Sequence, residues 1–301
     1  MRRAILTAAV LPCLLVLLHP QRQAGAESAP PGVRIGVVDT LAPGMPAKLL
    51  AIAMRPFRAY MEEQTGLAGE VVRGGDAFSL AKQLQEGAVQ VAIFHGHEFA
   101  WVREKHPALR PIVICISQCR DIRAALVVPE KCEAGGCAEL KGKAVALPRD
   151  ARAHCRVYLE RNCVEEGVPA CKFYRLAQPS YTDDTLDEVA SGKLEGAVVD
   201  SAALERYRKC HPARARSLRV LQESGTFPPG VIAYCHGRLP EATVKKLRAT
   251  LLAAKDDPKG QVTLKRLRMS SFEPPSEEFD VSLRSIAKAY PAPAPIPEGG
   301  K

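Results

Sequence analysis

The sequence predicts an α/β protein of two domains with largely parallel sheets. Apolar, strand-like runs alternate with segments of helical spacing along almost the whole chain. Its 301 residues are about twice the ~150 of an average domain. The composition, 47% hydrophobic and 25% charged, is typical of a globular protein and excludes a disordered, collagen-like or coiled-coil chain. Strands that alternate with helices form parallel sheets covered by helices, which gives the predicted class.

Two residues mark boundaries in the first half of this alternation. Pro56 interrupts a helical pattern over residues 47–65, so it must kink that helix or start a second one. Asp76 precedes a helical pattern over residues 77–86 and is placed to cap it. The other expected elements here are strands at 33–38, 69–73, 89–94, 111–117 and 122–128 and a helix at 97–105.

The second half continues the alternation with short apolar runs. A strand at 144–147 follows a turn, and the last three helical patterns close the chain before a Pro- and Gly-rich tail at 291–301, which we expect to be flexible. The expected strands are 144–147, 173–176, 196–199, 218–221 and 231–235, and the expected helices are 151–166, 184–191, 201–208, 241–254, 260–268 and 277–289.

Residues 1–26 have the pattern of a cleaved signal peptide. A basic start precedes an apolar run over residues 4–18, and small residues fit a cleavage site after Ala26. The alternative, a membrane anchor, needs about 20 apolar residues, and His19 ends the run too early. The sequence therefore predicts a periplasmic or other extracytoplasmic protein.

The charge balance points to small anions rather than to nucleic acid. The chain has 42 Lys and Arg against 33 Asp and Glu, and the mature chain would retain 39 basic residues and a net charge of +6. A mild positive charge favours anionic ligands, although solvated surface charge is the simpler alternative. No Lys/Arg block is interleaved with aromatics, so we predict no nucleic-acid partner.

Nine cysteines would remain in the mature chain, which fits an oxidising compartment. Because nine is odd, at least one is free or pairs between chains. Cys132 and Cys137 flank a short loop with two glycines, and Cys163 and Cys171 flank a turn, so these are the disulfide candidates. The chain has no Cys-x-x-Cys, which disfavours a thioredoxin-like site.

Five stretches, in their order and spacing, resemble segments of one family. They are residues 33–38, 87–94, 139–147, 189–200 and 224–231, and together they extend over almost the whole mature chain. They are similar to substrate-binding proteins of ABC import systems, of the phosphate/phosphite/phosphonate or PhnD-like type.

This resemblance implies the type II periplasmic-binding-protein fold, with two α/β lobes, two crossing strands and a ligand cleft between the lobes. Lobe one would comprise residues 32–120 plus 222–290, and lobe two residues 121–221. The lobes would close around the ligand by a hinge motion. The implied partners are a small anionic ligand and a membrane permease, the protein is expected to be a monomer, and no cofactor is expected.

One part of the family pattern differs in this chain. Phosphonate binders of this type have a Ser-Thr-Ser cluster at a helix start, where hydroxyls and helix-terminal N–H groups bind the oxyanion. Aligned on Val145, this chain has Arg152 and His154 in that region instead. The planar guanidinium of Arg152 is suited to clamp an oxyanion.

Candidate ligand contacts lie where strands end, because ligands of open α/β sheets bind at the carboxyl ends of strands. Asp39 and Asp200 could instead cap the turn or helix that follows each of them. The His-x-His pair at 95–97 could instead bind a metal ion or cap a helix. We expect Trp101 to pack in the core rather than to stack on ligand. The candidates are Asp39, Thr40, His95, His97, Glu98, Arg149, Arg152, His154, Tyr181, Thr182 and Asp200.

Three function classes fit the sequence, of which a non-catalytic receptor of an ABC importer is preferred. The chain lacks the Gly-x-x-x-x-Gly-Lys-Ser/Thr loop of the ATPase subunit. A metal-binding or ligand-sensing protein of the same fold is the alternative, and would use His95, His97 and His154. An enzyme is less expected: neither Gly-x-Ser-x-Gly nor His-Glu-x-x-His occurs, and His154 and Cys155, adjacent on a helix, should not face one another.

Overall fold

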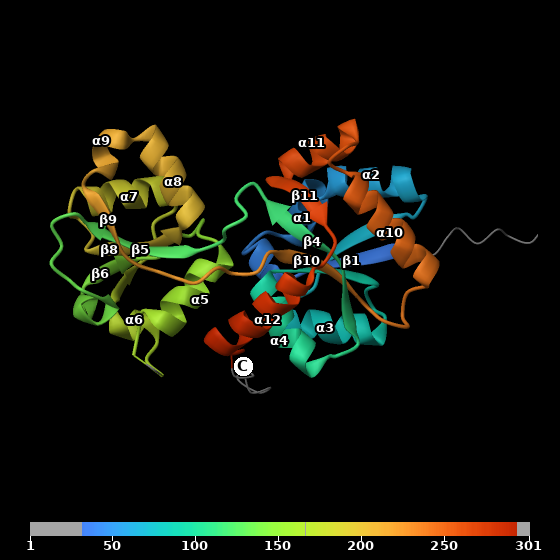
Figure 1. The fold of residues 1–301 in the computed structure, drawn as a ribbon, viewed down its shortest axis with the longest axis horizontal. Coiled ribbons are helices and arrows are strands. Elements are labelled where there is room, and N and C mark those ends of the chain that lie inside the picture. The colour runs from blue at the N-terminus through green and yellow to red at the C-terminus, as the bar shows by residue number, and fades with distance from the viewer. Residues whose placement is uncertain (1–31, 166, 294–301) are drawn as a thin grey trace, which may run out of the picture.

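The computed structural model describes residues 32–165 and 167–293, which form two lobes, each built around one β-sheet (Figure 1). The two-lobed α/β architecture predicted for the chain is therefore confirmed. The predicted signal peptide (1–26) and all but the first three residues of the predicted tail (291–301) lie outside the described residues. Among the helices that are described, none has the length and apolar character that a membrane crossing requires.

The first lobe contains a six-stranded sheet that brings together both ends of the chain. β1 pairs in parallel with β2 and β3, whereas β10 is antiparallel to β3 and β4, and β11 is antiparallel to β4. The edge strand β11 was not predicted, because it is short and mostly polar. In spatial order the strands are β11 (Met269–Glu273), β4 (Leu109–Ser117), β10 (Gly230–Cys235), β3 (Val91–Phe94), β1 (Val33–Val37) and β2 (Gly69–Arg73).

Helices cover both faces of this sheet. Of the two alternatives at Pro56, a kink or a second helix, the structure has the second helix, since one helix ends at Ala53 and the next begins at Arg55. Asp76 caps as predicted, accepting from the backbone N–H of Phe78 at 2.8 Å. The helices are α1 (Ala47–Ala53), α2 (Arg55–Thr65), α10 (Glu241–Ala253) and α11 (Pro258–Arg266) on one face, α3 (Ala77–Glu86), α4 (Gly96–Lys105) and α12 (Glu277–Ala289) on the other, and the 3-10 turn η1 (Asp39–Leu41) after β1.

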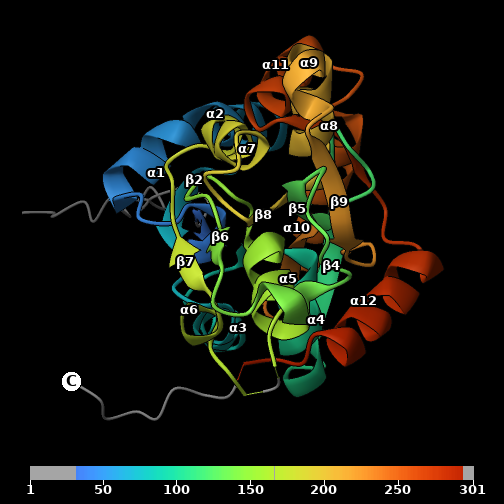
Figure 2. The ribbon, with the colours of Figure 1, turned by 90° about the vertical axis from the view of Figure 1, so that its left-hand side faces the viewer.

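The second lobe contains a five-stranded sheet with helices on both faces. Figure 2 looks onto this lobe and shows α7 and α8 above the sheet and α5 and α6 below it. The strands in spatial order are β7 (Arg175–Ala177), β6 (Ala144–Ala146), β8 (Gly196–Asp200), β5 (Ala124–Pro129) and β9 (Leu218–Glu223). The helices are α5 (Ala153–Asn162), α6 (Ala170–Phe173), α7 (Thr182–Ala190), α8 (Ser201–Cys210) and α9 (Pro212–Ala215), with the 3-10 turn η2 (Cys137–Leu140).

Both sheets are more mixed than the prediction of mostly parallel sheets. In the second lobe β6 pairs in parallel with β7 and β8, but β5 is antiparallel to β8 and β9. In each sheet the antiparallel strand inside the sheet, β5 or β10, is the first strand after the chain arrives from the other lobe. The two crossings, which the strand–helix alternation alone does not indicate, therefore produce the antiparallel pairings.

The two crossings between the lobes are hydrogen-bonded to one another. Ile122 and Phe227 form an isolated antiparallel bridge, and Phe227 donates its backbone N–H to the carbonyl of Ile122 at 2.8 Å. Ser224 donates in the same way to Ala124 at 2.9 Å. Figure 1 shows both segments passing side by side from one lobe to the other. This two-stranded link is the geometry expected of a hinge.

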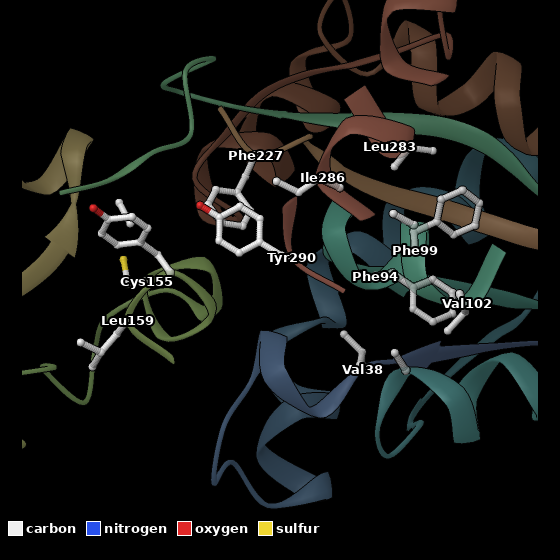
Figure 3. Close-up of a cluster of buried hydrophobic side chains, with 14 of the residues drawn as sticks. Val38, Phe94, Phe99, Val102, Cys155, Leu159, Phe227, Leu283, Ile286 and Tyr290 are labelled. Atoms are coloured by element: carbon white, nitrogen blue, oxygen red, sulfur yellow. The ribbon is translucent and has the colours of Figure 1, made fainter. Parts of the chain in front are cut away.

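One buried apolar cluster extends across the junction of the lobes (Figure 3). Cys155 and Leu159 contribute to it from α5, and Ile286 from α12. Between them lie the rings of Phe227 and Tyr290, whose centroids are 4.9 Å apart. The lobes are thus in apolar contact on the side of α12, next to the polar groups described below.

Candidate functional site

Four strand ends position the polar groups at the junction of the lobes. In the first lobe, β1 leads to Thr40 and β3 leads to His95. In the second lobe, the loop after β6 leads to His154 and β8 ends at Asp200. Because these are carboxyl ends of strands in an α/β sheet, they are the usual location of a ligand site.

The first-lobe group consists of Thr40, His95, His97 and Glu98. The Thr40 hydroxyl donates to Glu98 Oε1 at 2.7 Å, and the His95 backbone N–H donates to Glu98 Oε2 at 3.3 Å. The two imidazole rings stack with centroids 5.4 Å apart. His97 is buried and also meets the ring of Trp101 edge-on, so it packs rather than facing solvent.

Burial sets the charges of this group. It lowers the pKa of His95 to about 4, helped by the nearby positive charges of His154 and Arg152, although a hydrogen bond with the Thr40 backbone opposes the shift. Burial also lowers the pKa of His97 well below its ordinary value. Burial raises the pKa of Glu98 to about 7. Both imidazoles are therefore neutral near pH 7, and Glu98 is close to its midpoint.

His95 has a polar atom that the surrounding protein does not satisfy. Its Nε2 is buried and has no hydrogen-bond partner within the described residues. A buried polar atom left without a partner costs free energy, about 1–3 kcal/mol. An imidazole nitrogen in this state, at a strand end between two lobes, is suited to contact a bound ligand.

The second-lobe group is an ion-pair cluster of Arg152, His154 and Asp200. Asp200 Oδ2 lies 3.3 Å from His154 Nε2 and 3.5 Å from Arg152 Nη1. Asp200 Oδ1 accepts from the N–H groups of Ala202 and Ala203, so the same carboxylate caps α8. The sequence-based interpretation of Asp200 as a cap is therefore confirmed, and its contact with ligand stays a prediction. Oδ2 makes only these two loose contacts in the described structure.

The imidazole of His154 is charged in this setting. Burial lowers its pKa, but Cys155 and Asp200 outweigh burial and raise the pKa to about 10. Nε2 faces two acceptors, Asp200 Oδ2 and the carbonyl of Arg123 at 3.2 Å, so it carries a proton, and the adjacent carboxylate favours the charged form of the ring. With Arg152 and one carboxylate, the cluster has one positive charge in excess.

Phe227 connects the two groups. Its ring centroid is 5.7 Å from that of His97 and 5.3 Å from that of His154. Since Phe227 lies on the second crossing, the two halves of the candidate site meet at the hinge. Figure 3 shows its ring between α5 and the first lobe.

An open cavity of about 1250 Å³ adjoins the ion-pair cluster, between α8 of the second lobe and α11 of the first. It is lined mainly by charged side chains of both signs from both lobes and from the first crossing. The lining residues are Gln118, Cys119, Asp121, Arg123, Asp150, Arg152, Tyr181, Asp183, Asp184, Ser201, Ala202, Glu205, Arg206, Lys209, Glu223, Lys265 and Arg268.

Four predicted residues have other positions or partners. Asp39 forms a two-bond ion pair with Arg73, at 2.9 and 2.7 Å, because Arg73 ends the neighbouring strand β2. Arg149 is exposed. Tyr181 lines the cavity and is 64% exposed. Thr182 is buried and donates to Asp150 at 2.8 Å. The other candidates fall into two groups, which are Thr40, His95, His97 and Glu98 in the first lobe and Arg152, His154 and Asp200 in the second.

Two residues at the junction were not predicted. Arg123 contacts Asp121 and Glu223 and offers its carbonyl to His154, and Phe227 lies between the histidines. Both belong to the crossings, so the resemblance to a two-lobed protein with crossing strands was the available signal.

The expectation that His154 and Cys155 do not face one another was wrong, because Cys155 Sγ lies 3.6 Å from His154 Nε2. Cys155 is fully buried, so this contact offers a substrate no nucleophile.

The cysteines do not form the predicted pairs in this structure. All nine cysteines of the described residues are free thiols, and Cys132, Cys137, Cys163 and Cys171 are among them. Instead, Cys137 Sγ donates to Gln222 Oε1 at 3.0 Å, and Cys137 lies with Cys163 in one buried apolar cluster. Among the residues the structure describes, no three His, Cys, Asp or Glu side chains are arranged to bind a metal ion, so the metal-binding alternative gains no support there.

Residues 40–279 match the family model described as ABC transporter, phosphonate, periplasmic substrate-binding protein. No curated protein matches the sequence.

Solved structures share the fold. A binding protein component of an ABC phosphonate transporter from Pseudomonas aeruginosa is 15% identical, with a TM-score of 0.59 over 85% of each chain. XAC2383 from Xanthomonas citri, bound to ATP, is 18% identical, with a TM-score of 0.62 over 86% of this chain and 96% of that one. PhnD1 from Prochlorococcus marinus, in complex with methylphosphonate, is 15% identical, with a TM-score of 0.55 over 85% and 97%.

Proposed function

The chain belongs to the periplasmic phosphonate-binding proteins of ABC transporters, and on this premise we propose that it binds a small oxyanion of the phosphonate, phosphite or phosphate class at the junction of its lobes. The observation that carries the proposal is the excess positive charge of Arg152 and His154 over Asp200 at the start of α5. This charge acts on nearby His95, whose Nε2 has no hydrogen-bond partner among the described residues.

The start of α5 is suited to an anion. Its N-cap residue, Arg152, makes no side-chain cap hydrogen bond. The first-turn N–H groups of a helix are natural anion donors, and the helix dipole adds to the attraction. In this chain a guanidinium and an imidazolium take the place of the Ser-Thr-Ser cluster of related phosphonate binders, so recognition relies on charge more than on hydroxyl donors.

Arg152 is the residue that we assign to clamp the oxyanion. Its side chain is 43% exposed, lines the open cavity and makes a loose ion pair with Asp200 at 3.5 Å. A ligand oxygen at hydrogen-bond distance from the guanidinium would make a shorter contact than the ion pair of Arg152 with Asp200. His154 and His95 would contact the ligand from opposite lobes, and Thr40, Glu98 and Asp200 would orient them.

The hinge gives this arrangement a way to respond to ligand. Arg152 and His154 belong to the second lobe and His95 to the first. The distance between these groups therefore decreases only when the lobes move toward one another about the crossings. A ligand that contacts both groups stabilises the closed arrangement over an open one by its differential affinity. Such closure is the signal that a membrane permease partner would recognise, and transport by this chain would involve no catalysis of its own.

Export is part of the same proposal. The family is periplasmic, and residues 1–26 have the pattern of a cleaved signal peptide. Secreted in a bacterial host, the protein should begin at Glu27, which N-terminal sequencing of the purified protein would test.

We further propose that lobe one comprises residues 32–120 plus 222–290 and that lobe two comprises residues 121–221. We also propose that the protein acts as a monomer and binds no nucleic acid.

The proposal is tested by a thermal-shift panel of phosphate, phosphite, methylphosphonate, other alkylphosphonates, sulfate and alkylsulfonates. A ligand at 100 times its Kd adds about 2.7 kcal/mol, or roughly 5–10 °C for a chain of this size. Arg152→Ala should abolish most of the shift for the preferred ligand. Arg156→Ala is the matched control, since Arg156 lies one turn further along α5, is exposed and pairs with Glu160.

Two outcomes would contradict the proposal. One is the absence of any shift across the panel for a protein that unfolds cooperatively. The other is an equal loss of the shift in both arginine variants, which would show that the general charge of α5, rather than Arg152, attracts the ligand.

A further inference from the structure

Cys137 and Cys163 lie in the second lobe, neither of them lines the open cavity, and their thiols are close enough for each to shift the pKa of the other. Both thiols are buried, with 8% and 0% of each residue exposed, and they belong to one apolar cluster. We propose that Cys137 and Cys163 form a disulfide bond in the exported protein.

The main chains of the two cysteines are also drawn together. The hydroxyl of Tyr174 donates to the carbonyl of Cys163 and lies 3.4 Å from the carbonyl of Cys137. The carbonyl groups of both cysteines therefore lie close to one atom, the hydroxyl oxygen of Tyr174. A disulfide requires Cα atoms within about 7 Å, and this shared contact is the kind of proximity that allows it.

Closing the bond needs only a local adjustment. Cys137 begins η2 directly after Gly135 and Gly136, and Cys163 is the C-cap residue of α5. Neither sulfur is on an interior residue of a strand or a long helix. The sulfur atoms can therefore approach to a bond of about 2.05 Å without disrupting a hydrogen-bond ladder, and Cys137 gives up only its hydrogen bond to Gln222.

The pairs suggested by sequence spacing are less well placed. Cys171 is exposed on α6, whereas Ala170 and Phe173 of the same short helix point into the core. Cys171 thus faces solvent, away from the buried Cys163. The main chain at Cys132 is fixed by Arg219, which donates to its carbonyl at 2.6 Å.

The chemistry is a two-step thiol–disulfide exchange. The neighbouring thiol of Cys163 lowers the pKa of Cys137, which makes Cys137 the better attacking thiolate. Its sulfur attacks an oxidising disulfide donor, a class of protein present in the periplasm, and releases one donor thiol. Cys163 then attacks the Cys137 sulfur. The two thiols lose two protons and two electrons, and the donor is reduced to a dithiol.

The bond would join two segments that shape the ligand-side half of the second lobe. Cys137 precedes β6, and Cys163 ends α5, whose first turn contains His154. The closed loop of about 25 residues is long enough to gain substantial chain-entropy stabilisation from a crosslink. The inference is independent of the proposed ligand, and needs only that the chain folds in an oxidising compartment.

Peptide mapping of the exported protein, purified without reductant and alkylated in denaturant, tests the proposal. Trypsin should leave residues 132–141 and 162–172 as separate peptides, each with one proposed cysteine and one rival. We expect these two peptides to be linked. Further cleavage after glutamate separates Cys132 from Cys137 and Cys163 from Cys171, and should leave fragments 134–139 and 162–165 joined until reductant is added.

Other maps would overturn the proposal. Alkylation of all nine cysteines, or a disulfide within either tryptic peptide, excludes the Cys137–Cys163 bond. The bond predicts seven alkylated cysteines before reduction.

Stability provides a second readout. Dithiothreitol should lower the Tm of the exported protein by about 5–10 °C, but should not change that of the double variant Cys137→Ser/Cys163→Ser. The variants Cys132→Ser and Cys171→Ser are matched controls and should retain the dithiothreitol response. A response that persists in the double variant would contradict the proposal, even if that variant is less stable because its core has changed.

Discussion

The imidazole Nε2 of His154 lies 3.3 Å from Oδ2 of Asp200, so two helices of the second lobe begin on either side of one ion pair. α5 begins just before His154, and α8 begins directly after Asp200. The carboxylate is fixed because its other oxygen caps α8. Asp200 therefore orients the imidazolium while it compensates only one of the two positive charges beside it.

Asp200→Asn separates the two roles of this carboxylate. The amide oxygen can still cap α8, but the buried charge of His154 loses its counter-charge. Removing one partner of a buried pair is costly, and we expect the free energy of unfolding to fall by about 2–4 kcal/mol. Urea unfolding at pH 7 measures this change.

The matched control is Asp183→Asn. Asp183 pairs with Arg206 at 3.4 Å, with about half of each side chain exposed, and such pairs contribute about 0–1 kcal/mol. Equal losses in the two variants would show that the ion pair of Asp200 is not buried in solution.

A second prediction concerns alkaline pH and His154. The pKa of His154 is raised to about 10 in the folded protein, above about 6.5 in the unfolded chain. Between these values the folded state binds more protons, so this contribution is complete below pH 6.5 and decreases as the pH rises toward 10. The stability difference between the protein and His154→Gln should therefore shrink between pH 6.5 and 9.5, as measured by urea midpoints. A difference that stays constant over this interval would mean that His154 is not charged.

The third prediction concerns His95, whose titration should lower the stability of the protein at acidic pH. Its folded pKa of about 4 lies below that of the unfolded chain. The unfolded state therefore binds more protons between about pH 6.5 and 4, and stability is lost as the pH falls through that interval. His95→Gln should remove about 1–3 kcal/mol of this loss.

Two features keep the His95 comparison interpretable. Glu98 also titrates near pH 7, but it is present in both proteins and cancels in the difference. His236→Gln is the control, because His236 is 63% exposed. If His95→Gln and the control show the same acid profile as the unmodified protein, His95 is not buried neutral.

Local sequence signals predicted the elements well where the cause is local. Pro56 starts a helix because it has no N–H to donate, and Asp76 caps because its carboxylate accepts from the backbone N–H groups of Phe78 and Ser79. The strand-end rule made His95 and Asp200 candidates, the family resemblance added His154, and the structure places all three near the crossings between the lobes.

The partners of these residues could not be predicted from spacing. Asp39 pairs with Arg73 because parallel register aligns the ends of β1 and β2. Cys137 and Cys163 come together only in the buried core of the folded protein. The contact of His154 with Cys155 depends on side-chain rotamers in the first turn, which the angle between adjacent helical residues does not determine.

The last prediction tests how the hinge is packed against the first-lobe half of the site. A Cβ atom on Gly96, the first residue of α4, would lie 2.4 Å from the carbonyl oxygens of Pro228 and Pro229. Both oxygens are main-chain atoms of the second crossing, so neither can rotate away. Gly96→Ala must therefore displace the crossing or the start of α4, and we expect it to destabilise the protein by about 1–3 kcal/mol.

The same crossing supplies the control for this variant. A Cβ on Gly225 meets no atom within 4 Å, so Gly225→Ala should be neutral, or stabilising by up to about 1 kcal/mol through reduced chain entropy. Urea unfolding of the two variants measures the contrast. Because Gly96 directly follows His95, and Phe227 directly precedes Pro228, the displacement should also weaken any ligand-induced thermal shift in Gly96→Ala but not in Gly225→Ala. Equal stability of the two variants would mean that α4 does not abut the crossing, and the junction of the lobes would then be looser than the contacts of Phe227 with His97 and His154 imply.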